Sequence, residues 1–286
     1  MTLCATGDLV DEARGAGRAV VAFNVITLEH VEAVVAGLEQ AALPGIVQVS
    51  ENAVRFRQGA VLPLARAAAA CAEASGARLA LHLDHVTDPG LLRQAREAGF
   101  SSVMFDAGAA PYQENVRATR EAAYWAHGQG LWVEAELGYV GGKPDAPASA
   151  HEEGVRTDPE EAAAYVAATE VDALAVAVGS SHAMTERTAS LDHDLVRALA
   201  RRLDVPLVLH GSSGVPDDEL RRAVEAGMTK VNIGTALNLA FTGEVRDHLG
   251  QHPDVSDPRK YLRDARDAMA SAVAQLAAVV SAPTRA

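Results

Sequence analysis

The chain has 286 residues, a formal net charge of −13 and 49% hydrophobic residues, which is enough to bury a large core. The acidic balance, with no basic stripe, argues against nucleic acid as the main ligand, and no apolar run is long enough to predict a membrane span. Only two cysteines occur, without motif spacing, and the first residues lack the apolar core of a signal peptide. We therefore expect a cytoplasmic protein with reduced thiols.

Short apolar segments alternate along the chain with amphipathic segments rich in Ala, Leu, Arg and Glu. In chain order, the segments that we expect to form strands are 19–25, 45–50, 78–84, 101–107, 131–138, 173–179, 206–212 and 229–235. Amphipathic helices are expected between them, for example at 28–41, 61–75, 112–127, 159–169 and 217–226. Capping residues such as Thr27, Asp88 and Asp158 stand where helices should begin.

Eight strand–helix units in series predict the α/β class, as a (β/α)8 TIM barrel that forms a single domain over residues 1–286 with an extra C-terminal helix. A doubly wound open sheet is the alternative, but no glycine-rich phosphate turn follows the first strand. A barrel places its functional residues at the carboxyl ends of its strands. Polar or charged residues stand there in nearly every unit: Asn24, Ser50, Asp84, His85, Asp106, Glu134, Glu136, His182, His210 and Asn232.

Three histidines, His85, His182 and His210, lie near the ends of three different predicted strands. Three imidazoles with an open fourth position are typical of catalytic zinc. His82 lies inside its strand, where a core or supporting role is expected. Five other histidines are expected to be solvated on or near helices: His30, His127, His193, His248 and His252.

Carboxylates accompany these histidines. Asp84 stands directly before His85, where it would carry a proton for a metal-bound substrate or orient a histidine ligand. Asp106, Glu134 and Glu136 are candidates to bind a second, harder cation or to accept hydrogen bonds from the metal ligands.

The segments HGSSG (210–214) and KVNIGT (230–235) end the seventh and eighth predicted strands. Loops after these strands commonly bind phosphate in barrels, because glycines allow close backbone approach and helix N-termini favour anions. We therefore predict a phosphate site there.

The motifs LHLDH, GFSSVMFD, VEAELG..GG, VDALAVAVGSSHA, PLVLHGSSGVPD, KVNIGT and DPRKYLRDAR resemble, in order and spacing, those of the class II (metal-dependent) ketose-bisphosphate aldolases. The resemblance covers roughly residues 18–275. Fructose-bisphosphate and tagatose-bisphosphate aldolases are familiar members of that family. It implies a (β/α)8 barrel that cleaves a ketose 1,6-bisphosphate into dihydroxyacetone phosphate and glyceraldehyde 3-phosphate.

The resemblance also implies roles for particular residues. His85, His182 and His210 would bind Zn²⁺, and Asp84 would be the acid/base at the C4 hydroxyl. The other implied positions are a second, buried cation site (divalent or monovalent) at Asp106 and Glu136, the dihydroxyacetone-side phosphate site at Gly211, Ser213 and Thr235, Asn232 near the reacting carbons, and the far phosphate site at Asn24 and Ser50. Arg259 would reach that far site from a neighbouring subunit, so a homodimer or homotetramer is expected.

The small number and the positions of the lysines also favour a metal-dependent mechanism. The alternative aldolase chemistry forms a Schiff base on a lysine, but the chain has only Lys143, Lys230 and Lys260. None is predicted to stand at the end of a barrel strand.

The sequence departs from the family pattern where a mobile loop normally supplies a glutamate that moves the C3 proton, because Pro144 holds that position. The candidates to replace the glutamate are Asp145, His151, Glu152 and Glu153. Three alternatives therefore stay open: an aldolase for another phosphorylated ketose, a non-catalytic sugar-phosphate-binding subunit and a metal-dependent hydrolase. The last is disfavoured, since the first strand carries no His-x-His pair. Arg55 and Arg57 are expected either to bind an anion or to lie on a solvated helix face.

Overall fold

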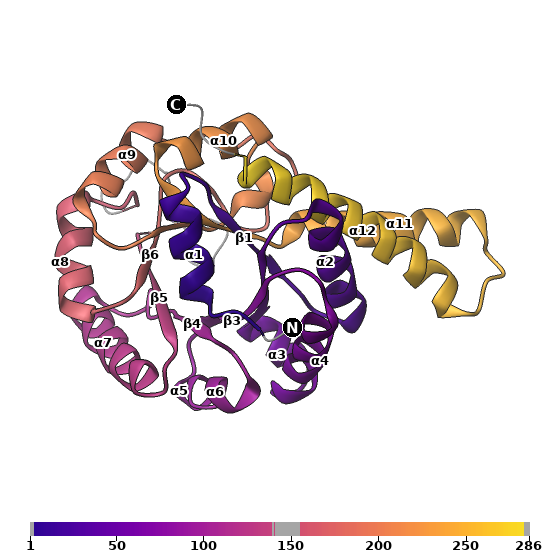
Figure 1. Ribbon diagram of the computed structural model, residues 1–286, viewed down its shortest axis with the longest axis horizontal. Helices are drawn as coiled ribbons and strands as arrows, with labels where there is room; N and C mark the ends of the chain where they lie inside the picture. Colours follow the sequence, from indigo (N-terminus) through magenta and orange to yellow (C-terminus); the bar gives the residue numbers. More distant parts are fainter. Residues whose placement is uncertain (1–2, 139, 141–154, 283–286) are drawn as a thin grey trace.

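The computed structural model describes residues 3–138, 140 and 155–282. Parallel strands close into a barrel in which each strand pairs with its neighbours in chain order. The strands are β1 (Val20–Asn24), β2 (Gly45–Ser50), β3 (Leu79–Val86), β4 (Ser102–Phe105), β5 (Trp132–Leu137), β6 (Ala173–Val176), β7 (Leu207–Leu209) and β8 (Met228–Ile233). The predicted (β/α)8 barrel is confirmed, and helices surround it (Figure 1).

Most strands are shorter than predicted, by one to four residues. Strand β3 differs: it extends past the predicted end at residue 84, and its last residue, Val86, pairs with Phe105 beyond an irregularity in the register. His85 thus lies within the strand rather than after it.

The predicted helices are present as α2 (Leu28–Ala41), α4 (Leu62–Ala74), α7 (Tyr112–Gly128), α8 (Pro159–Thr169) and α10 (Asp217–Ala226). The expected caps are in place: Thr27 accepts a hydrogen bond from the His30 backbone N–H, and Asp158 accepts from two backbone N–H groups of α8. The connections contain further short elements, namely α3 (Glu51–Phe56), α5 (Pro89–Leu92), α6 (Ala95–Ala98), α9 (His193–Arg202) and the 3-10 turn η1 (Ser212–Gly214).

Helix α1 (Thr6–Gly15) lies across the amino-terminal end of the barrel (Figure 1). Its Leu9 and Val10 are buried in one cluster with Val20 and other strand residues. Thr6 Oγ1 lies 2.6 Å from Ser102 Oγ at the start of β4. The helix thus covers this end of the barrel.

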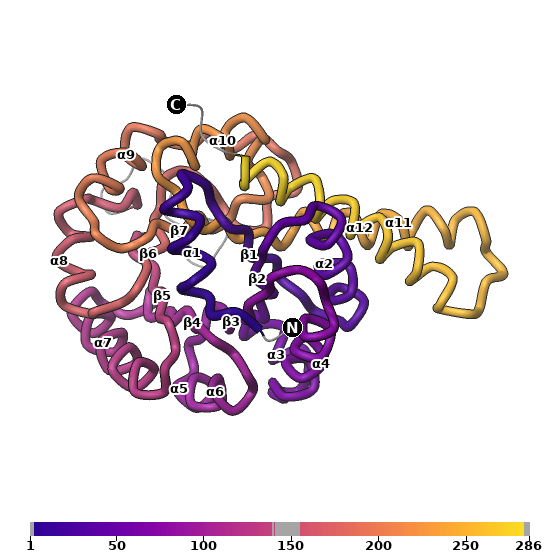
Figure 2. Tube along the Cα trace, viewed as in Figure 1, coloured from indigo at the N-terminus to yellow at the C-terminus, as the bar shows by residue number. Residues whose placement is uncertain are grey.

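Helices α11 (Thr235–Gln251) and α12 (Pro258–Val280) form a helical arm that projects from the barrel (Figure 2). The second half of α12 returns and packs against α2. Gly37 permits this close approach, because a Cβ there would lie 2.5 Å from the Ala270 carbonyl oxygen. The tip of the arm, with Arg259, extends away from the barrel of its own chain.

Two histidines predicted to be solvated are instead buried. His30 packs edge-on against Phe241 and accepts a hydrogen bond from the Ile26 backbone, and burial lowers its pKa. His193 Nε2 lies 2.9 Å from Glu219 Oε2. Those predictions were wrong because the neighbouring helices that cover these positions come from distant parts of the chain. In the described residues, no helix is long and apolar enough to cross a membrane.

Candidate active site

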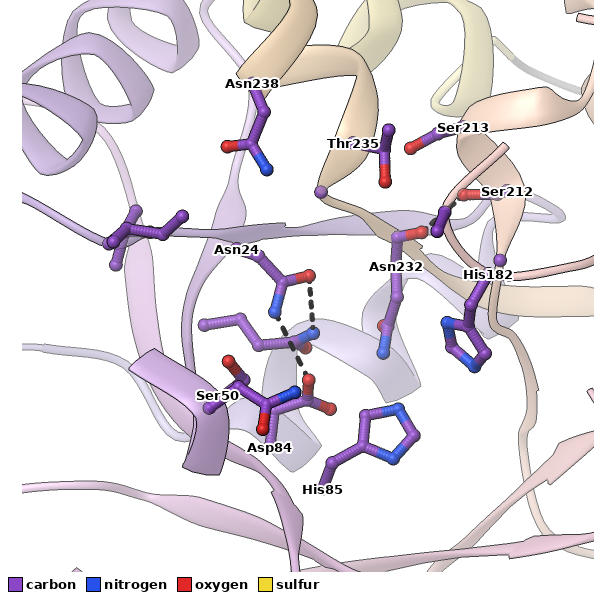
Figure 3. Close-up of a pocket in the computed structure, with 17 residues that line it drawn as sticks. Asn24, Ser50, Asp84, His85, His182, Ser212, Ser213, Asn232, Thr235 and Asn238 are labelled. Atoms are coloured by element: carbon purple, nitrogen blue, oxygen red, sulfur yellow. Dashed lines mark hydrogen bonds between the residues drawn. The ribbon is translucent and has the colours of Figure 1, made fainter. Parts of the chain in front are cut away.

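A pocket opens at the carboxyl end of the barrel, opposite α1 (Figure 3). Its lining comes from β1, β2, β3 and β8 and from the loops after β6 and β7. Nine of the predicted site residues line it together: Asn24, Ser50, Asp84, His85, His182, Gly211, Ser213, Asn232 and Thr235. The barrel therefore gathers residues more than 200 positions apart in the sequence into one site.

Four side chains form a cluster that fits a metal ion. His85, Glu136, His182 and His210 each offer one ligand atom, and these atoms all lie within 4.8 Å of one another. The three imidazole rings are 4.9 to 5.9 Å apart between centroids. Three imidazole nitrogens with one carboxylate oxygen are a donor set that zinc accepts readily.

Carboxylates outside this cluster hold two of the imidazoles. Asp106 Oδ2 lies 3.0 Å from His85 Nδ1, and Glu134 Oε1 lies 2.7 Å from His210 Nε2. Such contacts orient histidine ligands and leave the opposite ring nitrogen for a metal. Asp106 therefore stands beside a candidate ligand, outside the group of four donors, whereas Glu136 belongs to that group.

The charged groups in this cluster shift one another's pKa. Burial disfavours the charged form of His210, but hydrogen bonds to Glu134 and Glu136 overcome burial and raise its pKa to about 9. For His85, burial again opposes the charge, and the nearby Asp84 carboxylate together with Asp106 raises the pKa above its usual value. The cluster thus concentrates negative charge that favours any cation, a proton or a metal ion.

Asp84 and His85 are consecutive, yet both side chains line the pocket. Successive side chains of a regular strand point to opposite faces. His85 has a left-handed backbone with φ of 50°, next to the irregularity in the β3–β4 register, and this local twist turns its side chain to the same side as Asp84. Left-handed backbone in a non-glycine residue is costly and concentrates at functional sites.

Asp84 is buried, and its Oδ2 accepts a hydrogen bond from Asn24 Nδ2 at 3.2 Å. Burial raises the pKa of its carboxyl, but the positive charges of His85 and other neighbours overcome burial and hold that pKa below its usual value. The second oxygen, Oδ1, is buried without a hydrogen-bond partner among the described residues. An ionised carboxylate with an unused oxygen in a pocket is suited to accept a proton from a bound molecule.

The other side of the pocket is shaped to bind an anion. Gly211 adopts a left-handed backbone with φ of 63°, and Thr235 begins the 17-residue helix α11. Ser213 Oγ accepts from the Ala236 backbone N–H at 3.1 Å, which joins this turn to the start of α11. A helix N-terminus beside a glycine turn favours negative charge.

The three arginines lie elsewhere. Arg259 is exposed at the start of α12 and pairs with Asp257, so its own chain's pocket does not contain it. Arg55 pairs with Glu51, and Arg57 donates to the Ile26 carbonyl oxygen at 2.8 Å. Neither of these two lines the pocket. The predicted loop residues, Pro144, Asp145, His151, Glu152 and Glu153, fall outside the described residues.

The sequence predictions missed several functional candidates. Gln48, Asn52 and Asn238 also line the pocket, and Lys230, placed by the sequence at the start of its strand, is buried inside the barrel beside it. Gln48 was detectable in principle, because it stands two residues before Ser50 and therefore faces the same side of β2. Asn238 was detectable in a similar way, because it stands three residues after Thr235 and this spacing places both on one face of a helix.

The fold and this site define a (β/α)8 barrel with a histidine–carboxylate cluster beside an anion-binding turn. The model of the family described as class-II fructose-bisphosphate aldolase matches residues 4–284. The chain belongs to that family.

Solved structures agree with this assignment. The chain is 28% identical to the YdjI aldolase from Escherichia coli K12, with a TM-score of 0.85 and coverage of 99% of this chain and 98% of that one. A candidate fructose-1,6-bisphosphate aldolase from Coccidioides immitis is 27% identical, with a TM-score of 0.83 and coverage of 96% and 95%. The fructose-bisphosphate aldolase of Campylobacter jejuni shares the fold, at 21% identity, a TM-score of 0.81 and coverage of 98% and 95%.

Proposed function

We propose that the protein is a zinc-dependent aldolase that reversibly cleaves a ketose 1,6-bisphosphate, of the fructose or tagatose type, to dihydroxyacetone phosphate and glyceraldehyde 3-phosphate. One observation carries the proposal: the pocket unites two imidazoles of the metal cluster, those of His85 and His182, with the Asp84 carboxylate and the Gly211–Thr235 anion site. A retro-aldol cleavage of a phosphorylated ketose needs these three elements together.

The metal is assigned to His85, His182 and His210, with Glu136 as a further donor. A bound divalent ion supplies a Lewis acid that withdraws charge from the ketose carbonyl. Asp106 and Glu134 hold two of the imidazoles in the orientation that this requires. A second cation at Asp106 and Glu136, divalent or monovalent, remains part of the proposal.

Asp84 is the base in this scheme. Its carboxylate takes the proton of the C4 hydroxyl, C4 becomes the aldehyde carbon as the C3–C4 bond breaks, and the electron pair stays with C3 of the three-carbon fragment as an enediolate. A proton delivered to C3 then completes dihydroxyacetone phosphate. Burial of Asp84 keeps water away from the proton that it holds.

The phosphate of the dihydroxyacetone half is assigned to the turn at Gly211 and Ser213 and to the first turn of α11 at Thr235. Asn24 and Ser50, on the opposite wall, are assigned to the far end of the substrate. Asn232 lies between these two ends (Figure 3) and is assigned to the reacting carbons.

The far end of the site is assigned to a second copy of the chain. Arg259 is exposed at the start of α12, on the projecting arm, and we expect it to enter another molecule's pocket. Leu239 and Leu249 are exposed on the same arm, and their burial would favour association. We therefore propose a homodimer or homotetramer. Both cysteines are free, which supports a reducing, cytoplasmic location.

The test is cleavage of fructose 1,6-bisphosphate and tagatose 1,6-bisphosphate by the purified, zinc-loaded protein, with and without a chelator. Chelator-sensitive release of triose phosphate from either supports the proposal and identifies the C4 epimer. No cleavage of either, with zinc bound, would point to another phosphorylated ketose or to a non-catalytic subunit that binds sugar phosphates.

A further inference from the structure

Lys230 lies on β8 inside the barrel, and its side chain is fully buried. Its Nζ atom is 2.8 Å from Glu134 Oε2, 2.7 Å from Asn232 Oδ1 and 3.4 Å from Gln48 Oε1. A lysine ammonium has three donors and no acceptor. Each of the three atoms that face it must therefore accept a hydrogen bond, and this requirement sets the direction of every bond that follows.

Three branches of a hydrogen-bond network start at Lys230 Nζ, and the first of them leads to Asn232. Because its Oδ1 atom accepts from Lys230, the other end of the same amide, Nδ2, must point away from the lysine. Figure 3 shows this amide directed toward His85, across the pocket. Asn232 thus presents an N–H donor to whatever occupies the reacting position.

The second branch runs through Gln48 and Asn24 to Asp84. Gln48 Oε1 faces Lys230, so Gln48 Nε2 donates to Asn24 Oδ1 at 3.2 Å. With that oxygen engaged, Asn24 Nδ2 donates to Asp84 Oδ2 at 3.2 Å. Both of these bonds are drawn in Figure 3. Because Lys230 can only donate to Gln48 Oε1, the two amides that follow are oriented so that Asp84 accepts from an N–H of Asn24 and does not face its carbonyl oxygen.

The third branch runs through Glu134 to the metal cluster. Glu134 Oε2 accepts from Lys230, and Oε1 lies 2.7 Å from His210 Nε2. An ionised carboxylate only accepts, so His210 Nε2 donates to Glu134, while His210 Nδ1 lies 2.7 Å from Glu136 Oε2. The buried ammonium and the buried carboxylate also neutralise each other, which a charge in this position requires.

We propose that Lys230 is a positioning residue: it sets the hydrogen-bond direction of Gln48, Asn24 and Asn232, so that Asp84 always receives an N–H and the pocket always meets the Asn232 amide nitrogen. Its functional consequence rests on the proposed role of Asp84 as the base. Lys230 itself does not touch the substrate; it acts through these three amides.

The decisive variant is Gln48→Glu, which keeps the size of the side chain and still accepts from Lys230. Its second oxygen can no longer donate to Asn24 Oδ1, so Asn24 turns and places its own oxygen against Asp84. We expect kcat to fall by about tenfold or more, with KM within about threefold and zinc content unchanged. The matched control is Gln129→Glu, the same change at an exposed position after α7, with activity unchanged. A smaller fall in kcat, or a fall that follows the loss of zinc, would overturn the proposal.

A neutron crystal structure of the unmodified protein gives a second test that needs neither a variant nor activity. The expected result is deuterium on Asn24 Nδ2 facing Asp84 and on Asn232 Nδ2 facing the pocket. The reverse orientation of either amide would overturn the proposal, also in the case that Gln48→Glu fails to fold. If the unmodified protein cleaves no ketose phosphate, the proposed function fails, while the neutron result still decides the hydrogen-bond direction.

Discussion

His210 Nδ1 lies 2.7 Å from Glu136 Oε2, and both residues belong to the cluster whose donor atoms lie within 4.8 Å of one another. The pair joins the loop after β7 to strand β5 across the barrel. A buried imidazole beside a buried carboxylate is an arrangement that a divalent ion would complete, since it supplies the positive charge that the carboxylate lacks.

Zinc binding should depend on the clustered histidines and on no others. We expect about one zinc per chain and, in His182→Ala, an affinity about 100-fold or more lower, because one of few donors is lost. His127→Ala is the control, since His127 pairs with Asp172 on the surface. Competition with a chromogenic chelator measures both affinities. Equal affinities in the two variants would show that the ion is bound elsewhere.

Asp84→Asn should abolish proton transfer without dismantling the site. The substitution keeps the shape of the side chain but removes its basicity, so kcat should fall by about 100-fold or more. Zinc content, measured in parallel, should stay at the level of the unmodified protein. A variant that keeps its zinc and retains a tenth or more of kcat would exclude Asp84 as the base.

Gly211→Ala should damage both stability and zinc binding. Gly211 has a left-handed φ of 63°, and an added Cβ would lie 2.6 Å from the Ser181 backbone, next to His182. We expect a loss of about 1–3 kcal/mol in the free energy of unfolding, measured by urea denaturation, together with weaker zinc binding. Gly15→Ala, at the end of α1 with no atom within 4 Å, is the control and should be neutral or slightly stabilising. An unchanged free energy of unfolding in Gly211→Ala would mean that the loop after β6 moves aside for the added Cβ without cost.

Glu51, the first residue of helix α3, connects this helix to the loop after β3. The buried carboxylate accepts from the Thr87 backbone N–H at 2.6 Å, from Thr87 Oγ1 at 2.9 Å and from the Asp88 backbone N–H at 3.2 Å. Burial raises the pKa of Glu51, but these hydrogen bonds and the charge of Arg55 overcome burial and hold that pKa below 4.5.

A lowered pKa means that the ionised form stabilises the fold above about pH 4.5, and that this contribution disappears as the pH falls through the folded-state pKa. Glu51→Gln should therefore cost about 1–3 kcal/mol at pH 7 and should lose less further stability than the unmodified protein between about pH 5 and pH 3. Urea denaturation across this range measures both. Parallel pH profiles of the two proteins would contradict the assignment.

Arg259 should act in the pocket of another chain. Asp84→Asn and Arg259→Ala are each expected to lose most cleavage of the bisphosphate. In a co-expressed mixture, half of the dimers are hybrids, and each hybrid contains one pocket with both Asp84 and an incoming Arg259. About a quarter of the unmodified activity should therefore return. Absence of any recovery, with hybrid dimers shown by mass spectrometry, would place the action of Arg259 in its own chain or outside the reaction.

Much of the fold followed from the sequence because a barrel strand is short, apolar and bounded by polar residues. Segment 45–50 is strand β2 and segment 28–41 is helix α2, at the predicted bounds. The carboxyl-end rule then placed Asp84, His85 and His210 at one end of the barrel, and the pocket contains or adjoins them.

The sequence could not predict which side chains are buried by elements that are distant along the chain. His30 and His193 stand on helices with ordinary amphipathic patterns, and only the packing of α11 near α2 and of α10 near α9 covers them. Lys230 likewise resembles a strand-start lysine until the barrel closes and encloses it.

Local periodicity and residue order were enough to predict the class of fold, the residues at the strand ends and the family. How those residues act on one another depends on contacts that form only when the barrel closes. Closing the barrel brings Glu134 of β5 to Lys230 of β8 and Gln48 of β2 to Asn24 of β1. The direction of each hydrogen bond then depends on which donors and acceptors meet in the barrel interior, where Gln48, Glu134 and Lys230 are buried away from water.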